Sequence, residues 1–136
     1  MIMASIEYTG NLRTQAKHFR SGVKIISDAP TDNNGRGEAF SPTDLLATSL
    51  ASCMITVMGI AAEKRAISYK NISGNITKVM ASDPRRVDTI RITLKIEENW
   101  SGKERKLLEN VALNCPVAKS LSPEIKQEIV FEYTSS

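Results

Sequence analysis

Alternation of apolar and polar residues predicts strands near both ends of the chain. Residues 3–9, 12–18 and 23–27 are short extended segments separated by glycine-containing turns, which is typical of antiparallel hairpins. The clearest alternation lies in Val87 to Trp100, where every second residue from Ile90 to Ile96 is isoleucine or leucine. We expect this strand to bury one face and to expose the other.

A long helix is predicted to begin after Phe40. Ser41 fits the N-cap, Pro42 the first helical position and Asp44 the third. Between Leu45 and Ala62 apolar residues occupy nearly every side of this helix, so a single sheet cannot cover it. A second helix, a second chain, or both must supply the remaining cover. We expect no membrane span, because this stretch is short and carries several polar residues.

Shorter elements complete the pattern after the long helix. A strand is predicted at residues 72–76, and a second helix is expected to begin at Ser101 with Glu104 at its third position. A short helical turn at 117–121 and a closing strand at 128–134 follow. The order β-β-β-α-β-β-α-β predicts an α+β fold with a mainly antiparallel sheet, formed by residues 1–136 as a single domain.

Composition narrows the classes of function. With 136 residues, 41% hydrophobic and 24% charged, the chain fits one soluble globular domain. Its 18 basic and 15 acidic residues are scattered, so we expect no nucleic-acid partner. Two cysteines and one histidine cannot supply a four-ligand Cys/His zinc site on one chain, and they exclude a disulfide scaffold. No basic segment followed by an apolar segment opens the sequence, so we expect a cytoplasmic protein with reduced thiols.

The two cysteines are the candidate chemical groups. Cys53 lies in the long predicted helix, and Cys115 lies at the break after the second helix. Each could be a small core residue. Alternatively, the two thiols meet in space, so that one is oxidised and the other resolves it as a disulfide. Because Cys115 is expected to cap the short helical turn that Pro116 opens, its thiolate is predicted to be the better stabilised of the two.

Two motifs resemble those of one protein family. The segment Phe40-Ser-Pro-Thr-Asp-Leu-Leu-Ala-Thr-Ser-Leu-Ala-Ser-Cys53 is similar to the helix signature of the OsmC/Ohr family of thiol-dependent peroxidases. The segment Asn114-Cys-Pro-Val-Ala-Lys-Ser-Leu121 resembles that family's second cysteine motif. The resemblance implies an intertwined homodimer, in which two sheets wrap a pair of central cysteine-bearing helices and two active sites lie at the dimer interface.

The resemblance also implies a role for each cysteine. Cys53 would be the peroxidatic cysteine, which attacks the O–O bond of an organic hydroperoxide in oxidative or osmotic stress defence. Cys115 would be the resolving cysteine, which condenses with the resulting sulfenic acid. An external dithiol would reduce the disulfide, so no resident metal, flavin or haem cofactor is expected.

A cation is needed to activate Cys53. A free thiol titrates near about 8.5, and Cys53 lies about three turns inside its helix, beyond the reach of the field at the helix N-terminus. The family uses an arginine from an early strand, paired with a glutamate near the start of the cysteine helix. Arg13 in the second predicted strand is our candidate, and Arg20 and Arg36 are the alternatives.

The chain departs from the family pattern at the glutamate. Thr43 stands directly after the proline, and Asp44, one position later, is already assigned to the helix cap. A shift of one residue turns a helical side chain by about 100°. Glu38, in the loop before the cap, could substitute from another direction. The missing glutamate favours an alternative function, a non-catalytic OsmC-like protein that binds an apolar small molecule or senses redox state, whereas the two cysteines favour the peroxidase.

Overall fold

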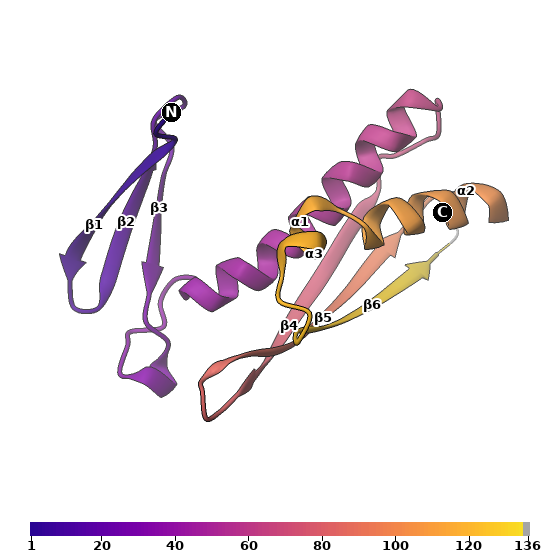
Figure 1. Cartoon of the computed structure of the whole chain (residues 1–136). Coiled ribbons are helices and arrows are strands. Elements are labelled where there is room, and N and C mark those ends of the chain that lie inside the picture. Colours follow the sequence, from indigo (N-terminus) through magenta and orange to yellow (C-terminus); the bar gives the residue numbers. More distant parts are fainter. Residues whose placement is uncertain (135–136) are drawn as a thin grey trace. The chain divides into compact units, whose positions relative to one another are not determined.

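The computed structural model describes residues 1–134, and the chain forms two compact units that divide after Leu46 (Figure 1). The first unit is an antiparallel sheet in the order β1-β2-β3 followed by one 3-10 turn. Its elements are β1 (Ala4–Gly10), β2 (Arg13–His18), β3 (Lys24–Asp28) and η1 (Thr31–Asn33). The three strands confirm the alternation-based prediction, with ends that differ by one residue.

The first sheet presents an apolar face to solvent. Ile6, Ala16 and Ile25 are paired across the three strands and therefore lie on the same face. Ile6 is 70% exposed and Ile25 is 52% exposed. Tyr8, two residues after Ile6 and hence on this face, is 66% exposed. A sheet face of this composition is ordinarily covered in a folded protein.

The long helix α1 (Pro42–Lys64) begins with the predicted cap. The backbone N–H of Asp44 donates to Ser41 Oγ at 3.1 Å, and the backbone N–H of Ser41 donates to Asp44 Oδ2 at 3.0 Å. These reciprocal bonds satisfy N–H groups that the first helical turn leaves unpaired. The carboxylate of Asp44 is therefore engaged at the helix start, as the sequence indicated.

The second unit contains most of α1 and a three-stranded sheet in the order β4-β5-β6. Its other elements are β4 (Ile72–Ala81), β5 (Arg86–Ile96), α2 (Gly102–Leu113), α3 (Pro116–Ser120) and β6 (Lys126–Tyr133). Strands β4 and β5 are antiparallel, whereas β5 and β6 are parallel. The sheet is therefore mixed, because the chain crosses back through α2 and α3 before β6 begins.

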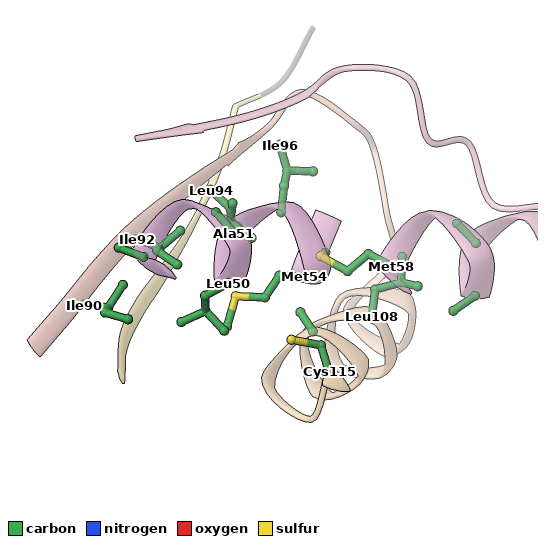
Figure 2. Packing of buried hydrophobic residues seen from close by; sticks show 14 of the residues in the cluster. Leu50, Ala51, Met54, Met58, Ile90, Ile92, Leu94, Ile96, Leu108 and Cys115 are labelled. Carbon is green, nitrogen blue, oxygen red and sulfur yellow. The ribbon is translucent and has the colours of Figure 1, made fainter. Parts of the chain in front are cut away.

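The core of the second unit lies between α1, α2 and one face of its sheet (Figure 2). The predicted alternation in β5 is confirmed, since the isoleucine and leucine positions are buried while Arg91 and Lys95 are exposed. The largest fully buried apolar side chains are Leu50, Met54, Met58, Ile90, Ile92, Leu94, Ile96 and Leu108. This packing fixes the orientation of α1 within the unit.

Only one side of α1 is buried in this unit. Leu50, Met54 and Met58 are fully buried, whereas Ile60 is 50% exposed. With 23 residues, α1 is long enough and apolar enough to cross a membrane by length and composition alone, contrary to the expectation from its polar residues. Core helices of soluble proteins meet the same criterion, and the burial of its methionines against β5 and α2 fits a core helix.

Candidate active site

The structure brings the two cysteines together within the second unit. Cys53, on α1, is half-buried and packs against the core cluster. Cys115 is 1% exposed and belongs to that cluster (Figure 2). The two thiols lie near enough to interact, since the neighbouring Cys53 contributes to the raised pKa of Cys115. Both are free thiols. A disulfide between two cysteines requires Cα atoms within about 7 Å of each other.

Cys115 owes its position to the start of α3. Its backbone is extended, with φ −65° and ψ 157°, and its sulfur accepts the backbone N–H of Ala118 at 3.5 Å. Pro116 occupies the first helical turn, where its missing N–H costs nothing. The predicted cap is therefore confirmed, and it holds the sulfur in a fixed place.

The environment of Cys115 disfavours its thiolate. Burial raises the pKa of this thiol above its ordinary value, and the neighbouring Cys53 raises it further. The N–H groups of Ala118 and Val117 lower the pKa, but their effect is smaller. The expectation that the start of α3 would stabilise a Cys115 thiolate is therefore wrong, because removal of water from the sulfur outweighs the helix-start N–H groups.

Arg13 lies in the first unit, where it forms a two-pronged ion pair with Asp28. Nε of Arg13 is 2.6 Å from Oδ1 of Asp28, and Nη2 is 2.9 Å from Oδ2. The two residues are direct cross-strand partners in β2 and β3. The Asp28 side chain is fully buried, whereas the Arg13 side chain keeps 22% of its surface exposed.

The pair is electrostatically matched. The hydrogen bond from Arg13 lowers the pKa of Asp28, and the bond to Asp28 raises the pKa of Arg13. The backbone N–H of Glu38 donates to Oδ2 of Asp28 at 3.1 Å, and the Glu38 carboxylate adds a further attraction for Arg13. Glu38 was the expected substitute for the glutamate, but the direct partner of Arg13 is Asp28.

Sequence reasoning missed Asp28 because this residue was assigned to the loop that follows the third strand. The signal was present in the predicted hairpins. Extending β3 by one residue places an aspartate directly opposite Arg13, and oppositely charged side chains at facing positions attract each other. Of the alternative arginines, Arg36 contributes a longer-range attraction to Asp28, and Arg20 lies on the exposed surface.

The site has no metal cluster of the usual composition. Among residues 1–134, no group of three histidine, cysteine, aspartate or glutamate side chains is arranged to hold a metal ion. What the second unit offers is a pair of thiols, one buried and one half-buried. What the first unit offers is a guanidinium fixed by a buried carboxylate.

Comparison with known proteins identifies the family. The model of the OsmC family, described as OsmC-like protein, matches residues 35–130. A crystal structure from Psychrobacter arcticus 273-4, of a protein named for osmotic stress induction and detoxification response, shares 50% sequence identity. It superimposes with a TM-score of 0.93, covering 96% of each chain. No curated protein matches the sequence.

More distant structures share the fold. An organic hydroperoxide resistance protein OsmC from Legionella pneumophila is 18% identical, with a TM-score of 0.70 over 95% of this chain and 94% of that one. The organic hydroperoxide resistance protein OhrB of Bacillus subtilis is 15% identical, with a TM-score of 0.65 over 96% and 98%. Proteins named for hydroperoxide resistance thus share this fold. Because the family model matches residues 35–130, this chain belongs to the OsmC family.

Proposed function

We propose that this protein is a thiol-dependent peroxidase that reduces organic hydroperoxides. The observation that carries the proposal is the pair of neighbouring free thiols, Cys53 and Cys115. A lone buried cysteine is commonly a core residue, but two neighbouring thiols on different elements form a dithiol that can be oxidised and reduced. The hydroperoxide-resistance proteins that share the fold agree with this chemistry.

The proposed reaction has three steps. The Cys53 thiolate attacks the terminal oxygen of the hydroperoxide, the O–O bond breaks, and the departing alkoxide takes a proton to become the alcohol. The resulting Cys53 sulfenic acid condenses with the Cys115 thiol, which releases water and forms a disulfide. An external dithiol then reduces this disulfide by exchange and is itself oxidised to a disulfide.

The raised pKa of Cys115 supports this division of roles. Burial raises the pKa of Cys115 and disfavours its thiolate, which makes Cys115 the poorer attacking group at neutral pH. The half-buried Cys53 is also the more accessible of the two to a hydroperoxide. Cys53 is therefore assigned as the attacking group and Cys115 as the resolving group.

Arg13 is proposed as the cation that assists Cys53. A guanidinium has five N–H donors, and the pair with Asp28 uses two of them. Three donors are left to bind a thiolate or the oxygen on which charge develops as the O–O bond breaks. The support for this role is the family resemblance together with the partial exposure of the Arg13 side chain.

A second copy of the chain is proposed as the cover for the apolar surfaces. The face that carries Ile6, Tyr8 and Ile25, and the side of α1 that carries Ile60, expose large apolar side chains. A homodimer would bury these surfaces, and the hydrophobic effect favours this burial. Light scattering after gel filtration tests the dimer, and a monomer at micromolar concentration would contradict it.

The peroxidase is tested by titrating the reduced protein with cumene hydroperoxide, and with hydrogen peroxide in parallel. Free thiols and intramolecular disulfide are followed by mass spectrometry in the wild type, Cys53→Ser and Cys115→Ser. We expect rapid disulfide formation in the wild type and a persistent sulfenic acid on Cys53 in Cys115→Ser. Because serine also caps a helix well, Cys115→Ser is a matched variant that keeps the start of α3.

The same titration distinguishes the peroxidase from the alternative function. Thr43 stands where the family has a glutamate, and this difference favours a non-catalytic protein that binds an apolar small molecule or senses redox state. If both thiols stay reduced at a large excess of either peroxide, the peroxidase is refuted. A disulfide that forms with oxidised glutathione but not with hydroperoxide would instead identify a redox sensor.

A further inference from the structure

We propose that Asp28 is the positioning residue for Arg13. It holds the edge of the guanidinium formed by Nε and Nη2, so that the N–H groups of Nη1 and the second N–H of Nη2 stay available to the reacting anion. This inference rests on the proposed peroxidase function. Asp28 takes the place of the carboxylate that the chain lacks at Thr43. The assignment follows from the first unit alone, in which the arginine, its partner and the anchors of that partner are all described.

The geometry of the pair fixes the plane of the guanidinium. Asp28 binds the edge formed by Nε and Nη2 through two separate oxygens at 2.6 and 2.9 Å. Two parallel charge-assisted bonds determine orientation as well as distance, which a single contact does not. Among the described residues, Asp28 is the only hydrogen-bond partner of the Arg13 side chain. The three remaining N–H groups, two on Nη1 and one on Nη2, therefore face away from Asp28.

Asp28 is itself buried and is held by two hydrogen bonds to the backbone. Its side chain is fully buried, and its Oδ2 accepts the backbone N–H of Glu38 at 3.1 Å. Its backbone N–H donates to the carbonyl of Phe40 at 3.1 Å, which ties the end of β3 to the segment before α1. A carboxylate anchored in this way cannot follow a moving guanidinium. It therefore acts as a fixed support for Arg13.

Two roles for Asp28 predict effects of opposite sign. If Asp28 only balanced the charge of Arg13, neutralising the aspartate would strengthen the attraction of Arg13 for an anion and would speed the reaction. If Asp28 positions Arg13, the same change removes the support and slows the reaction. Asp28→Glu separates the roles again, because it keeps the charge but displaces the carboxylate by one methylene group.

The test measures kcat and KM for cumene hydroperoxide, with dithiothreitol as reductant, in Asp28→Asn, Asp28→Glu, Arg13→Lys and the double variant Arg13→Lys/Asp28→Asn. We expect each single variant to lower kcat/KM on the order of tenfold to a hundredfold, as misplacement of a catalytic group does. In the Arg13→Lys background, Asp28→Asn should cause no further loss, since Asp28 acts through Arg13. Glu7→Gln, an exposed carboxylate on the same sheet, is the matched control and should match the wild type.

Two results overturn the inference. The first is an unchanged or faster reaction in Asp28→Asn. The second is a loss that adds in full to that of Arg13→Lys, because a merely structural role would damage both backgrounds alike. Circular dichroism and thermal melting confirm that each variant is folded. If Asp28→Asn does not fold, Asp28→Glu decides the question in both backgrounds, because charge balance predicts wild-type kinetics and positioning predicts a loss.

A second measurement separates failure of this inference from failure of the peroxidase. The rate of Cys53 alkylation by iodoacetamide, measured at neutral pH in Cys115→Ser, uses no peroxide and reports the thiolate directly. We expect Asp28→Asn and Arg13→Lys to slow alkylation by similar factors. If the wild type does not react with hydroperoxides but Asp28→Asn still slows the alkylation of Cys53, only the peroxidase function is refuted. Alkylation that is unchanged or faster in Asp28→Asn would refute the role of Asp28.

Discussion

Glu98 holds the crossover between the cysteine-bearing helix and the second sheet, and removing its carboxylate should destabilise the protein. The side chain is 7% exposed and lies just beyond the end of β5. Its Oε2 accepts the backbone N–H groups of Lys70 at 2.5 Å and Asn71 at 3.0 Å, and its Oε1 accepts the Ser68 hydroxyl at 2.9 Å. One carboxylate thus satisfies three donors of the segment that joins α1 to β4.

The magnitude follows from these three bonds. A hydrogen bond to a charged group contributes about 1.5–3 kcal/mol, and a buried donor left without a partner costs about 1–3 kcal/mol. Because the hydroxyl of Ser68 can turn to water, we expect Glu98→Ala to lose about 3 kcal/mol of unfolding free energy. In Glu98→Gln the amide oxygen can still accept both backbone N–H groups. We therefore expect a loss of about 1 kcal/mol from the missing charge.

The loss should depend on pH in a defined direction. The N–H groups of Lys70 and Asn71 lower the pKa of Glu98 in the folded protein, while an unfolded glutamate titrates near about 4.3. The ionised carboxylate therefore contributes its full stability above about pH 4.3, and this contribution disappears as the pH falls through the lower folded pKa. The wild type and Glu98→Gln should accordingly differ at pH 7 and converge in acid.

Urea unfolding at fixed protein concentration measures these differences, since stability depends on concentration if the protein is a dimer. Glu97→Gln is the matched control, because the neighbouring carboxylate is exposed. The reasoning is refuted if Glu98→Ala unfolds within about 0.5 kcal/mol of the wild type, which is the range of ordinary surface substitutions. A gap between wild type and Glu98→Gln that widens in acid would refute the assigned direction of the pKa.

Four further substitutions test the packing along α1 and the environment of Cys115. Gly59→Ala should lower the melting temperature, although alanine gains up to about 1 kcal/mol in helix propensity. The added methyl group would lie 3.1 Å from the ring of Tyr69, and the hydroxyl of Tyr69 ties this ring to α1 by a hydrogen bond to the carbonyl of Ile55. Leu50→Ala should cost about 2–5 kcal/mol in urea unfolding, since this side chain is fully buried, whereas Leu46→Ala, at an exposed position of the same helix, should cost less than 1 kcal/mol. In Cys53→Ser, Cys115 should react with iodoacetamide far more slowly at pH 7 in the native protein than in urea, because burial raises the pKa of its thiol. Equal rates would contradict the raised pKa of Cys115.

Local structure could be predicted from the sequence wherever residues close together in the chain determine it. The caps at Ser41, Ser101 and Cys115 are all present, because each depends on residues within three positions along the chain. The buried face of β5 followed from alternation alone, since successive side chains in a strand point to opposite sides. Family membership also followed from the two cysteine motifs, whose residues are adjacent in sequence.

Other features required the tertiary structure. The parallel pairing of β5 with β6 depends on the path of the chain through α2 and α3, which alternation cannot specify. The sequence did not specify which side of α1 is buried, because this helix is apolar nearly all round and the elements packed against it determine the side that they cover. The direction of the Cys115 pKa was predicted wrongly from the cap, since burial is a property of the whole unit rather than of its local sequence.

The candidate site shows the same distinction between sequence and tertiary structure. The sequence by itself indicated the candidate groups, because Cys53 and Cys115 lie in recognisable motifs and Arg13 lies in an early predicted strand. Only the tertiary structure decided their neighbours, placing the two thiols near each other across 62 positions of sequence and giving Arg13 the carboxylate of Asp28. The physical reason is that side-chain chemistry is carried by each residue, whereas contact, burial and the resulting pKa arise from segments that meet only when the chain has folded.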